Sequence, residues 1–154
     1  MSTPSAGDKV PSFEAISTIG TIKSTDTKGH KLVIYFYPKD NTPGCTTETE
    51  GFRDHYQAFR DADCYVLGVS RDSLKSHENF SQKLGLPFPL LADTDSVVCH
   101  AFNVIKEKNM YGKKVMGIER STFLIDPSGH IAKAWRGVKV PGHVQEVLQA
   151  VQTS

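Results

Sequence analysis

The sequence predicts an α/β protein with one central mixed sheet flanked by helices. Residues 32–37 form an unbroken apolar run rich in β-branched and aromatic types, and residues 65–70 are interpreted as a second buried strand. A helix is predicted after each of them, the first from helical spacing of apolar residues and the second from capping residues, and the chain closes with a hairpin and a last helix. This order of elements predicts the fold class. A length of 154 residues predicts a single domain with its own core.

The N-terminal segment has the weakest pattern. Residues 1–8 are polar and lack the apolar stretch of a secretory signal, so we expect them to be frayed. Residues 11–16 and 21–27, around Gly20 and Gly29, are interpreted as short strands or an irregular hairpin that covers one edge of the sheet.

The first buried strand runs into a turn and then a helix. Pro38 ends the strand because proline has no N–H group to offer the sheet, and residues 40–44 (Asp-Asn-Thr-Pro-Gly) have turn chemistry. Phe52, Tyr56 and Phe59 then recur at helical spacing, which predicts the helix.

Two starts of this helix fit the sequence. Thr42 as the N-cap, with Pro43 at the first helical position, places Cys45 inside the first turn. Thr47 as the N-cap, with Glu50 closing a capping box, leaves Cys45 just outside the helix. In both cases the sulfur lies near free backbone N–H groups at the positive end of the helix dipole, an environment that favours the thiolate.

Capping residues and periodicity predict the remaining elements. Ser73 is expected to cap a helix that runs to Leu84, with Gly85 beyond its end. Residues 90–92 lead into a short helix that is capped by Asp95 or Ser96, and the polar segment 106–117, which contains glycines, is expected to be a loop. Residues 120–125 and 130–135 are predicted to form a hairpin about the turn 126–129. A closing helix carries on one stripe Val144, Val147, Leu148 and Val151.

Composition excludes several classes of function. Eighteen basic and 17 acidic residues, without a basic block, give no footprint for nucleic acid or for an anionic membrane. No apolar run approaches the ~18 residues of a membrane-spanning helix. Three cysteines, an odd number, argue against a disulfide scaffold, so we expect a reducing compartment and a cytoplasmic protein. The six histidines are scattered without metal-ligand spacing, so we predict no metal and no other cofactor.

Cys45 has the setting of a nucleophile, because it lies in a polar turn at a helix start and not in an apolar run. A lower pKa can raise the thiolate fraction of a cysteine at neutral pH only about thirtyfold. It also makes the thiolate a weaker nucleophile, so the net gain in rate is about tenfold or less. Fast chemistry therefore needs donors aimed at the oxygen on which charge develops. Thr42 supplies a local hydroxyl, and a guanidinium from elsewhere in the chain would complete the site.

The pattern Pro38-x-x-x-Thr42-x-x-Cys45 resembles the active-site signature of the peroxiredoxins, and the flanking residues resemble their bacterioferritin-comigratory, or Q, branch. The resemblance implies a thioredoxin fold and thiol-dependent reduction of hydrogen peroxide and organic hydroperoxides, in which Cys45 becomes a sulfenic acid. It also implies that Thr42 hydrogen-bonds the peroxide, that Pro38 shields the pocket and that Arg120 is the pocket arginine.

Each supporting residue also has a plainer interpretation. On sequence alone Thr42 is more typical of a helix cap, and Arg120 of an exposed strand end in a weak surface ion pair. Arg53, on the active-site helix, is a weaker rival for the role of Arg120. Glu48 is either the acceptor that orients the arginine or a first-turn acid that suits the helix dipole.

The family usually reduces the sulfenic acid with a second, resolving cysteine, and this chain departs from that pattern. The two positions where members of the Q branch carry it are occupied by Glu50 and Ser81. Cys64 and Cys99 are interpreted first as packing residues, and a disulfide would require the Cα of one of them within ~7 Å of that of Cys45. We favour direct reduction by an external thiol such as thioredoxin, glutaredoxin or glutathione. The resemblance suggests a monomer.

Three other functions fit parts of this pattern. A dithiol oxidoreductase needs Cys-x-x-Cys, and the fourth position is Glu48. A cysteine hydrolase needs a nearby histidine base, and His55 lies ~15 Å further along the same predicted helix at 1.5 Å per residue, while the other histidines are not placed by the sequence. A peroxide sensor that signals through Cys45 oxidation without turnover is the remaining alternative.

Overall fold

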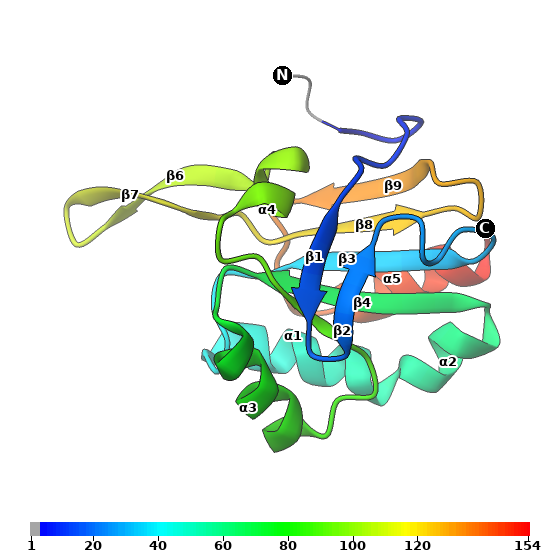
Figure 1. The fold of residues 1–154 in the computed structure, drawn as a ribbon, viewed down its shortest axis with the longest axis horizontal. Coiled ribbons are helices and arrows are strands. Elements are labelled where there is room, and N and C mark those ends of the chain that lie inside the picture. Colours follow the sequence, from blue (N-terminus) through cyan, green and yellow to red (C-terminus); the bar gives the residue numbers. More distant parts are fainter. Residues whose placement is uncertain (1–3) are drawn as a thin grey trace.

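The protein is built on one mixed sheet, seen in a computed structural model that describes residues 4–154 and leaves residues 1–3 outside the description. Seven strands lie in the order β2-β1-β5-β4-β3-β8-β9 (Figure 1). Their bounds are β1 Glu14–Ser17, β2 Gly20–Lys23, β3 Lys31–Phe36, β4 Cys64–Ser70, β5 Leu90–Ala92, β8 Ser121–Ile125 and β9 Ile131–Arg136. The pairs β3–β4 and β4–β5 are parallel, whereas β1–β2, β1–β5, β3–β8 and β8–β9 are antiparallel. The predicted mixed sheet and the edge hairpin are confirmed.

The central position of β3 explains its unbroken apolar run. Because side chains alternate across a strand, Ile34 and Phe36 pack into the core on one face of the sheet. Val33 and Tyr35 pack into a second core on the other face. With β4 on one edge and β8 on the other, the strand has no exposed side.

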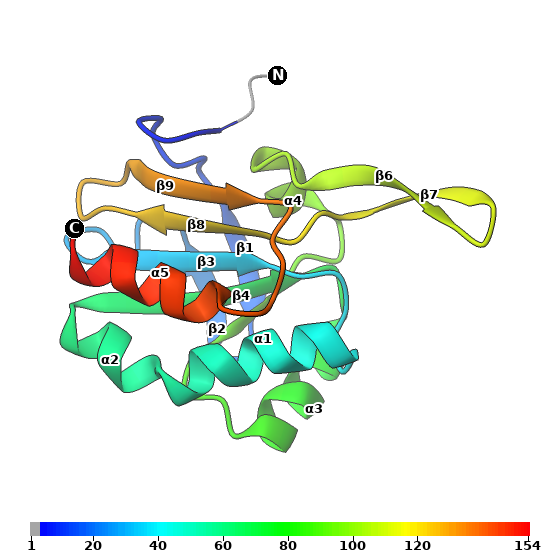
Figure 2. The same cartoon turned by 180° about the vertical axis from the view of Figure 1, so that it is seen from behind.

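Helices cover both faces of this sheet. On one face lie α1 (Pro43–Asp54), α2 (Tyr56–Asp61) and α5 (His143–Gln152), as Figure 2 shows, whereas α4 (Val97–Ala101) lies on the other. The remaining helix α3 (Leu74–Leu84) contributes Phe80 to the core beneath α1 and α5. None of the helices between residues 4 and 154 combines the length and the apolar character needed to cross a membrane.

The expected caps are mostly confirmed. The Ser73 hydroxyl accepts a hydrogen bond from the Ser76 N–H at 3.1 Å, and Gly85 ends α3 in the left-handed conformation at φ 62°. Ser96 occupies the N-cap position of α4 without a side-chain bond. The Asp93 carboxylate caps that helix instead, because it accepts hydrogen bonds from two of its first backbone N–H groups at 3.1 and 2.7 Å.

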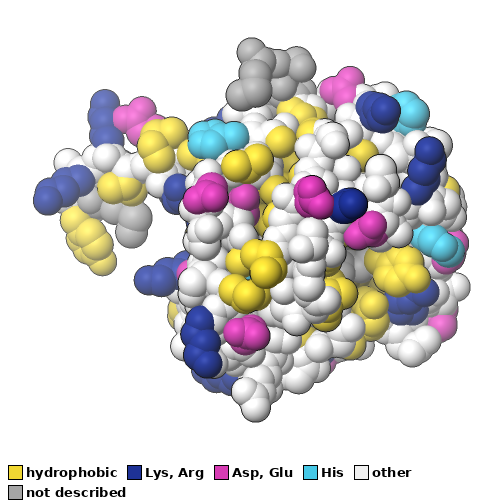
Figure 3. Space-filling model, in the orientation of Figure 1, with side chains coloured by type: hydrophobic (Ala, Val, Ile, Leu, Met, Phe, Trp, Pro, Cys, Tyr) yellow, Lys and Arg dark blue, Asp and Glu magenta, His cyan; other side chains and the backbone are white. Residues whose placement is uncertain are grey.

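The segment 106–117 is not the predicted loop. It forms an antiparallel hairpin of β6 (Ile105–Met110) and β7 (Lys113–Ile118) that projects from the body of the protein (Figures 1 and 2). The space-filling view shows lysines and apolar side chains exposed together on this arm (Figure 3). Backbone hydrogen bonds between the two strands and a turn with positive φ at Tyr111 and Gly112 hold this arm. The prediction was wrong because neither feature gives the sequence a periodic pattern of apolar residues.

Two smaller expectations also needed correction. The predicted active-site helix is divided, since α1 ends at Asp54 and α2 begins at Tyr56, although the apolar spacing continues through the break. The expected fraying of residues 1–8 is wrong for residues 4–8. The Gly7 N–H donates to the Ile131 carbonyl at 2.7 Å, and the Arg136 guanidinium donates to the carbonyl of Pro4 at 2.8 Å.

Candidate active site

The first turn of α1 carries Cys45. Thr42 is the N-cap and Pro43 the first helical residue, so the first of the two predicted helix starts is confirmed. The first intrahelical hydrogen bond runs from the Thr46 N–H to the Thr42 carbonyl at 2.8 Å. The N–H groups of Gly44 and Cys45 therefore precede the ladder of helical hydrogen bonds and have no acceptor within it. They provide the partial positive charge that stabilises an anion at this helix end.

Antiparallel pairing brings Arg120 to the same place. Ser121, the first residue of β8, pairs with Phe36, the last residue of β3. Arg120 precedes Ser121, so it lies at the end of the sheet where β3 turns into α1. Its backbone carbonyl accepts a hydrogen bond from the Val138 N–H at 2.9 Å, which fixes the start of the strand.

The guanidinium of Arg120 joins the sulfur to a buried carboxylate. Its Nη2 donates to Cys45 Sγ at 3.4 Å, and its Nη1 donates to Glu48 Oε1 at 2.6 Å. The Arg120 side chain is only 16% exposed and that of Glu48 is fully buried. Gly44 lies against the guanidinium, since a Cβ on this residue would be 3.4 Å from Nη2. The interpretation of Arg120 as an exposed surface arginine is therefore wrong.

Burial and charge pairing shift the pKa values of Glu48 and Arg120 in opposite directions. Burial raises the pKa of Glu48 to about 7, although the Arg120 guanidinium opposes the shift. Burial lowers the pKa of Arg120, but Glu48 and Cys45 outweigh burial and raise it above its ordinary value. Burial dominates for the carboxyl because it is enclosed completely, whereas the guanidinium keeps some contact with water. The second oxygen of Glu48, Oε2, has no hydrogen-bond partner among the described residues.

Lys108 is a neighbour of this site that the sequence did not indicate. It lies on β6, its side chain packs over the bare backbone of Gly117, and its ammonium donates to the carbonyl of Ile118. Burial lowers the pKa of Lys108, and the charge of Arg120 lowers it further, while Cys45 raises it. The residue was missed because its segment was predicted to be a loop.

Of the remaining predicted site residues, Thr42 and Pro38 lie in the turn before α1, whereas Arg53 lies near the other end of that helix. Thr42 is half-buried and its hydroxyl donates to the Lys39 carbonyl at 2.8 Å, so it does not cap α1 with its side chain. Pro38 is also half-buried. Arg53 points elsewhere, with Nη1 donating to the Leu84 carbonyl at 3.0 Å, and is not a rival for Arg120. The contact of Thr42 with peroxide and the shielding by Pro38 stay predictions.

Access to the sulfur is restricted. Cys45 is 1% exposed, whereas Gly44, which precedes it in α1, is half-buried. His55, the nearest histidine in sequence, ends α1 with its Nδ1 2.9 Å from the Gly51 carbonyl. The geometry thus surrounds Cys45 with a cation and helix amides, and His55 is in no position to act as its base.

The other two cysteines are packing residues, as predicted. Cys64 pairs with Lys31 at the far end of β3 from the turn, about 17 Å away along the strand at 3.3 Å per residue. Cys99 lies in α4 and packs in the core on the opposite face of the sheet. Burial raises the pKa of Cys64 to about 12, and burial together with Asp93 raises the pKa of Cys99 as well.

The structure also places Glu50 and Ser81, the two positions at which the resemblance implies a resolving cysteine, away from the polar contacts of the sulfur. Ser81 of α3 lines an apolar cavity of about 430 Å³ together with Tyr56 and Phe88, and Cys45 does not line this cavity. Glu50 lies on α1 with a side chain 42% exposed, 3.9 Å from Arg53. Neither residue contributes a polar contact to the sulfur.

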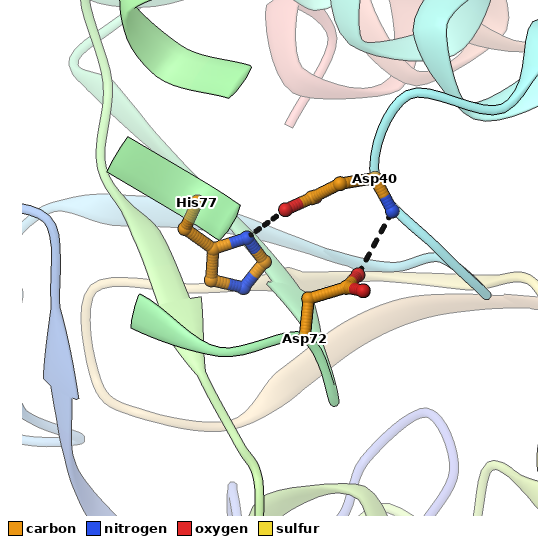
Figure 4. Close-up of side chains that lie close together, drawn as sticks. All are labelled: Asp40, Asp72 and His77. Carbon is orange, nitrogen blue, oxygen red and sulfur yellow. Dashed lines mark hydrogen bonds and ion pairs between the residues drawn. The ribbon is translucent and has the colours of Figure 1, made fainter. Parts of the chain in front are cut away.

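A cluster of Asp40, Asp72 and His77 adjoins the turn that precedes α1 (Figure 4). Their ligand atoms lie within 4.8 Å of one another, close enough to hold a metal ion. These atoms are already hydrogen-bonded, however, with His77 Nδ1 2.7 Å from Asp40 Oδ2 and Asp72 Oδ2 accepting from the Asp40 N–H at 2.8 Å. The sequence did not predict this cluster, because its members come from three separate segments.

Comparison with known proteins is consistent with this geometry. The model of the AhpC/TSA family matches residues 6–134. Peroxiredoxin Bcp of Xanthomonas campestris is 60% identical over 124 residues, which are 80% of this chain and 78% of that protein. Peroxiredoxin Bcp of Bacillus subtilis is 50% identical over 147 residues, or 95% and 94% of the two chains.

A solved structure shares the fold. Structures of the Xanthomonas campestris bacterioferritin comigratory protein, with a trapped intermediate and a ligand, concern its alkyl peroxide reduction activity. One of these is 54% identical, covers 92% of this chain and 90% of that chain, and superposes with a TM-score of 0.87. The predicted thioredoxin-like fold is thereby confirmed.

Proposed function

Because the chain belongs to the AhpC/TSA family and is a thiol peroxidase of the peroxiredoxin Bcp, or PrxQ, type, we propose that Cys45 is its peroxidatic nucleophile. The thiolate attacks one oxygen of the peroxide, the O–O bond breaks, and the second oxygen leaves as water or an alcohol after taking up a proton. The products are Cys45 sulfenic acid and the reduced peroxide. The observation that carries this proposal is the 3.4 Å hydrogen bond from Arg120 to the Cys45 sulfur at a helix N-terminus.

Each of the surrounding groups has a separate task in this proposal. The first-turn amides and the Arg120 guanidinium stabilise the thiolate, and they then stabilise the charge that moves onto the peroxide oxygens. Glu48 holds the guanidinium through the 2.6 Å bond to Nη1, which leaves Nη2 for the sulfur and the substrate. Thr42 donates a hydrogen bond to the bound peroxide after exchanging its present bond to the Lys39 carbonyl. Pro38 keeps water away from the reacting atoms.

The substrates proposed are hydrogen peroxide and organic hydroperoxides. The related Xanthomonas protein acts on alkyl peroxides, and we extend this activity to the present chain. Cys45 is 1% exposed, and we propose that the peroxide group reaches it past Pro38, Thr42 and Gly44, which are half-buried. The organic part of a hydroperoxide then stays outside these residues.

We propose that an external thiol, namely thioredoxin, glutaredoxin or a small thiol, reduces the sulfenic acid. This reductant attacks the Cys45 sulfur, water leaves, and a second thiol releases Cys45 from the mixed disulfide. The proposal rests on the position of the other sulfur atoms, since Cys64 and Cys99 are buried and remote from Cys45. The protein is proposed to act as a cytoplasmic monomer.

Intact mass after one equivalent of peroxide tests this mechanism. Wild-type protein and a Cys64→Ala/Cys99→Ala variant should both gain one oxygen, or give the trapped adduct of a sulfenic acid, while Cys45→Ser should remain unmodified. A loss of two hydrogens from the wild type that disappears in the double variant would overturn the one-cysteine mechanism. Oxidation of Cys45→Ser to the same extent as the wild type would overturn the assignment of the nucleophile.

The sensor alternative is tested by turnover. A peroxidase consumes many equivalents of peroxide per chain when thioredoxin, its reductase and NADPH are supplied. A sensor consumes about one equivalent and accumulates oxidised Cys45. The rate of Cys45 oxidation, followed in a stopped-flow instrument, should also exceed that of a free thiol by orders of magnitude.

A further inference from the structure

The turn between β3 and α1 is held by a buried carboxylate with several donors. Asp40 Oδ1 accepts from the Tyr37 hydroxyl at 2.6 Å. Asp40 Oδ2 accepts from the Ser76 hydroxyl at 2.8 Å and faces His77 Nδ1 at 2.7 Å. The backbone N–H of Asp40 donates to Asp72 at 2.8 Å, as Figure 4 shows. Ser76, His77 and Asp72, which lie outside the turn, therefore fix both the side chain and the backbone of Asp40.

The imidazole of His77 bridges the active-site turn and the sheet. Its Nε2 lies 3.0 Å from the Leu91 carbonyl, which can only accept a hydrogen bond, so Nε2 carries a proton. Its Nδ1 is hydrogen-bonded to Asp40 Oδ2 at 2.7 Å. The His77 side chain is fully buried, so the imidazole joins the Asp40 carboxyl to β5 in the interior of the protein.

Side chains of helix α3 are hydrogen-bonded to the active-site turn at two points. His77 and Ser76 hold Asp40 from the first turns of the helix. Near the other end of the helix, the Lys83 ammonium donates to Asn41 Oδ1 at 2.7 Å. Asn41 has a left-handed backbone with φ 61°, a conformation that asparagine tolerates better than most residues, and the bond from Lys83 fixes its side chain.

From this geometry we propose that His77 is a positioning residue for the peroxidase reaction. Through Asp40 it sets the path of residues 38–42, and so the places of Pro38 and Thr42 and the start of the helix that carries Cys45. His77 itself touches neither the sulfur nor the substrate. The inference rests on the proposed function of Cys45 and adds a residue outside the pocket on which its reactivity depends.

Two variants of similar shape separate this role from a general structural one. In His77→Asn the amide nitrogen occupies the position of Nδ1 and can still donate to Asp40, whereas the bond to the Leu91 carbonyl is lost. In His77→Gln the amide nitrogen reaches the position of Nε2, so the bond to Leu91 is kept and the bond to Asp40 is lost. Both variants leave a buried neutral amide, so they differ in which of the two hydrogen bonds is kept.

The rate of Cys45 oxidation by peroxide is measured by stopped flow for both variants, and urea unfolding gives their stability. We expect a decrease of about tenfold to a hundredfold in His77→Gln, since a displacement of about 1 Å can cost that much, and a rate within about threefold of wild type in His77→Asn. Equal rates in the two variants, or rates that follow stability alone, would overturn the proposal.

A milder variant keeps the test decisive if His77→Gln fails to fold. Ser76→Ala removes another donor to the same oxygen of Asp40 from a half-buried position, and its oxidation rate should fall about threefold with unfolding close to that of wild type. An unchanged rate in Ser76→Ala would then overturn the proposal. Failure of the proposed function itself would look different, because wild-type Cys45 would react no faster than a free thiol.

Discussion

Glu48 gives a quantitative test of the buried ion pair, because its protonation couples the stability of the fold to pH. Burial raises the pKa of Glu48 to about 7 from an ordinary value of 4.5, although Arg120 opposes the shift. When the pKa of a carboxyl is higher in the folded chain than in the unfolded chain, the proton that it binds stabilises the fold. This stabilisation is complete at a pH below the pKa of the unfolded chain, and it is lost as the pH rises through the pKa of the folded chain. At about 1.4 kcal/mol per pKa unit, the loss amounts to about 3 kcal/mol.

The perturbation is Glu48→Gln, which keeps the size of the side chain and an oxygen that accepts from Arg120 but has no proton to exchange. The free energy of unfolding in urea is measured for variant and wild type at several pH values from about 4.5 to 8. Wild type should lose about 3 kcal/mol relative to the variant over this range, with most of the change below and around pH 7. The rate of Cys45 oxidation should fall about tenfold in the variant, because the guanidinium loses its charged partner.

A matched control exists on the same helix. Glu50 lies two residues further along α1 with a side chain 42% exposed, so Glu50→Gln should follow the pH dependence of the wild type. If Glu48→Gln also runs parallel to wild type across the whole range, Glu48 does not titrate near neutral pH. Burial would then not raise the pKa of this carboxyl, and the predicted coupling of stability to pH would be refuted.

Three further substitutions test the site and its support. Arg120→Lys should lower the rate of Cys45 oxidation about a hundredfold, because an ammonium cannot reproduce the fork that holds the sulfur and the carboxylate together; a loss under threefold would contradict this. Thr42→Val should lower that rate at least tenfold while Thr42→Ser stays near wild type, and equal losses would mean that the hydroxyl has no role. Gly51→Ala should destabilise the fold by about 1–3 kcal/mol, since a Cβ there would lie 2.9 Å from Val144 Cγ2. Urea unfolding of Gly51→Ala/Val144→Ala should show the loss partly reversed, and unchanged stability in the single variant would contradict the close packing.

Local rules in the sequence predicted much of the fold. The apolar run of β3 is buried on both faces because the strand is central, so its composition alone reveals its environment. Ser73 and Gly85 mark the ends of α3 through their own backbone preferences. The hairpin β6–β7 was not predicted, because it is held by hydrogen bonds between backbone groups. Such bonds do not depend on the order of polar and apolar residues in the sequence.

The same division holds for the active site. Turn and capping preferences act over a few neighbouring residues, so they place Cys45 at a helix start after a strand that ends at Pro38. Folding of the whole chain is needed to bring Arg120, Glu48 and Cys45 into one network and His77 of α3 to the turn. Strand pairing and helix packing set those distances, and they depend on how segments far apart in the chain meet. A local pattern supplies the reactive atom, and the packed fold supplies the charges that surround it.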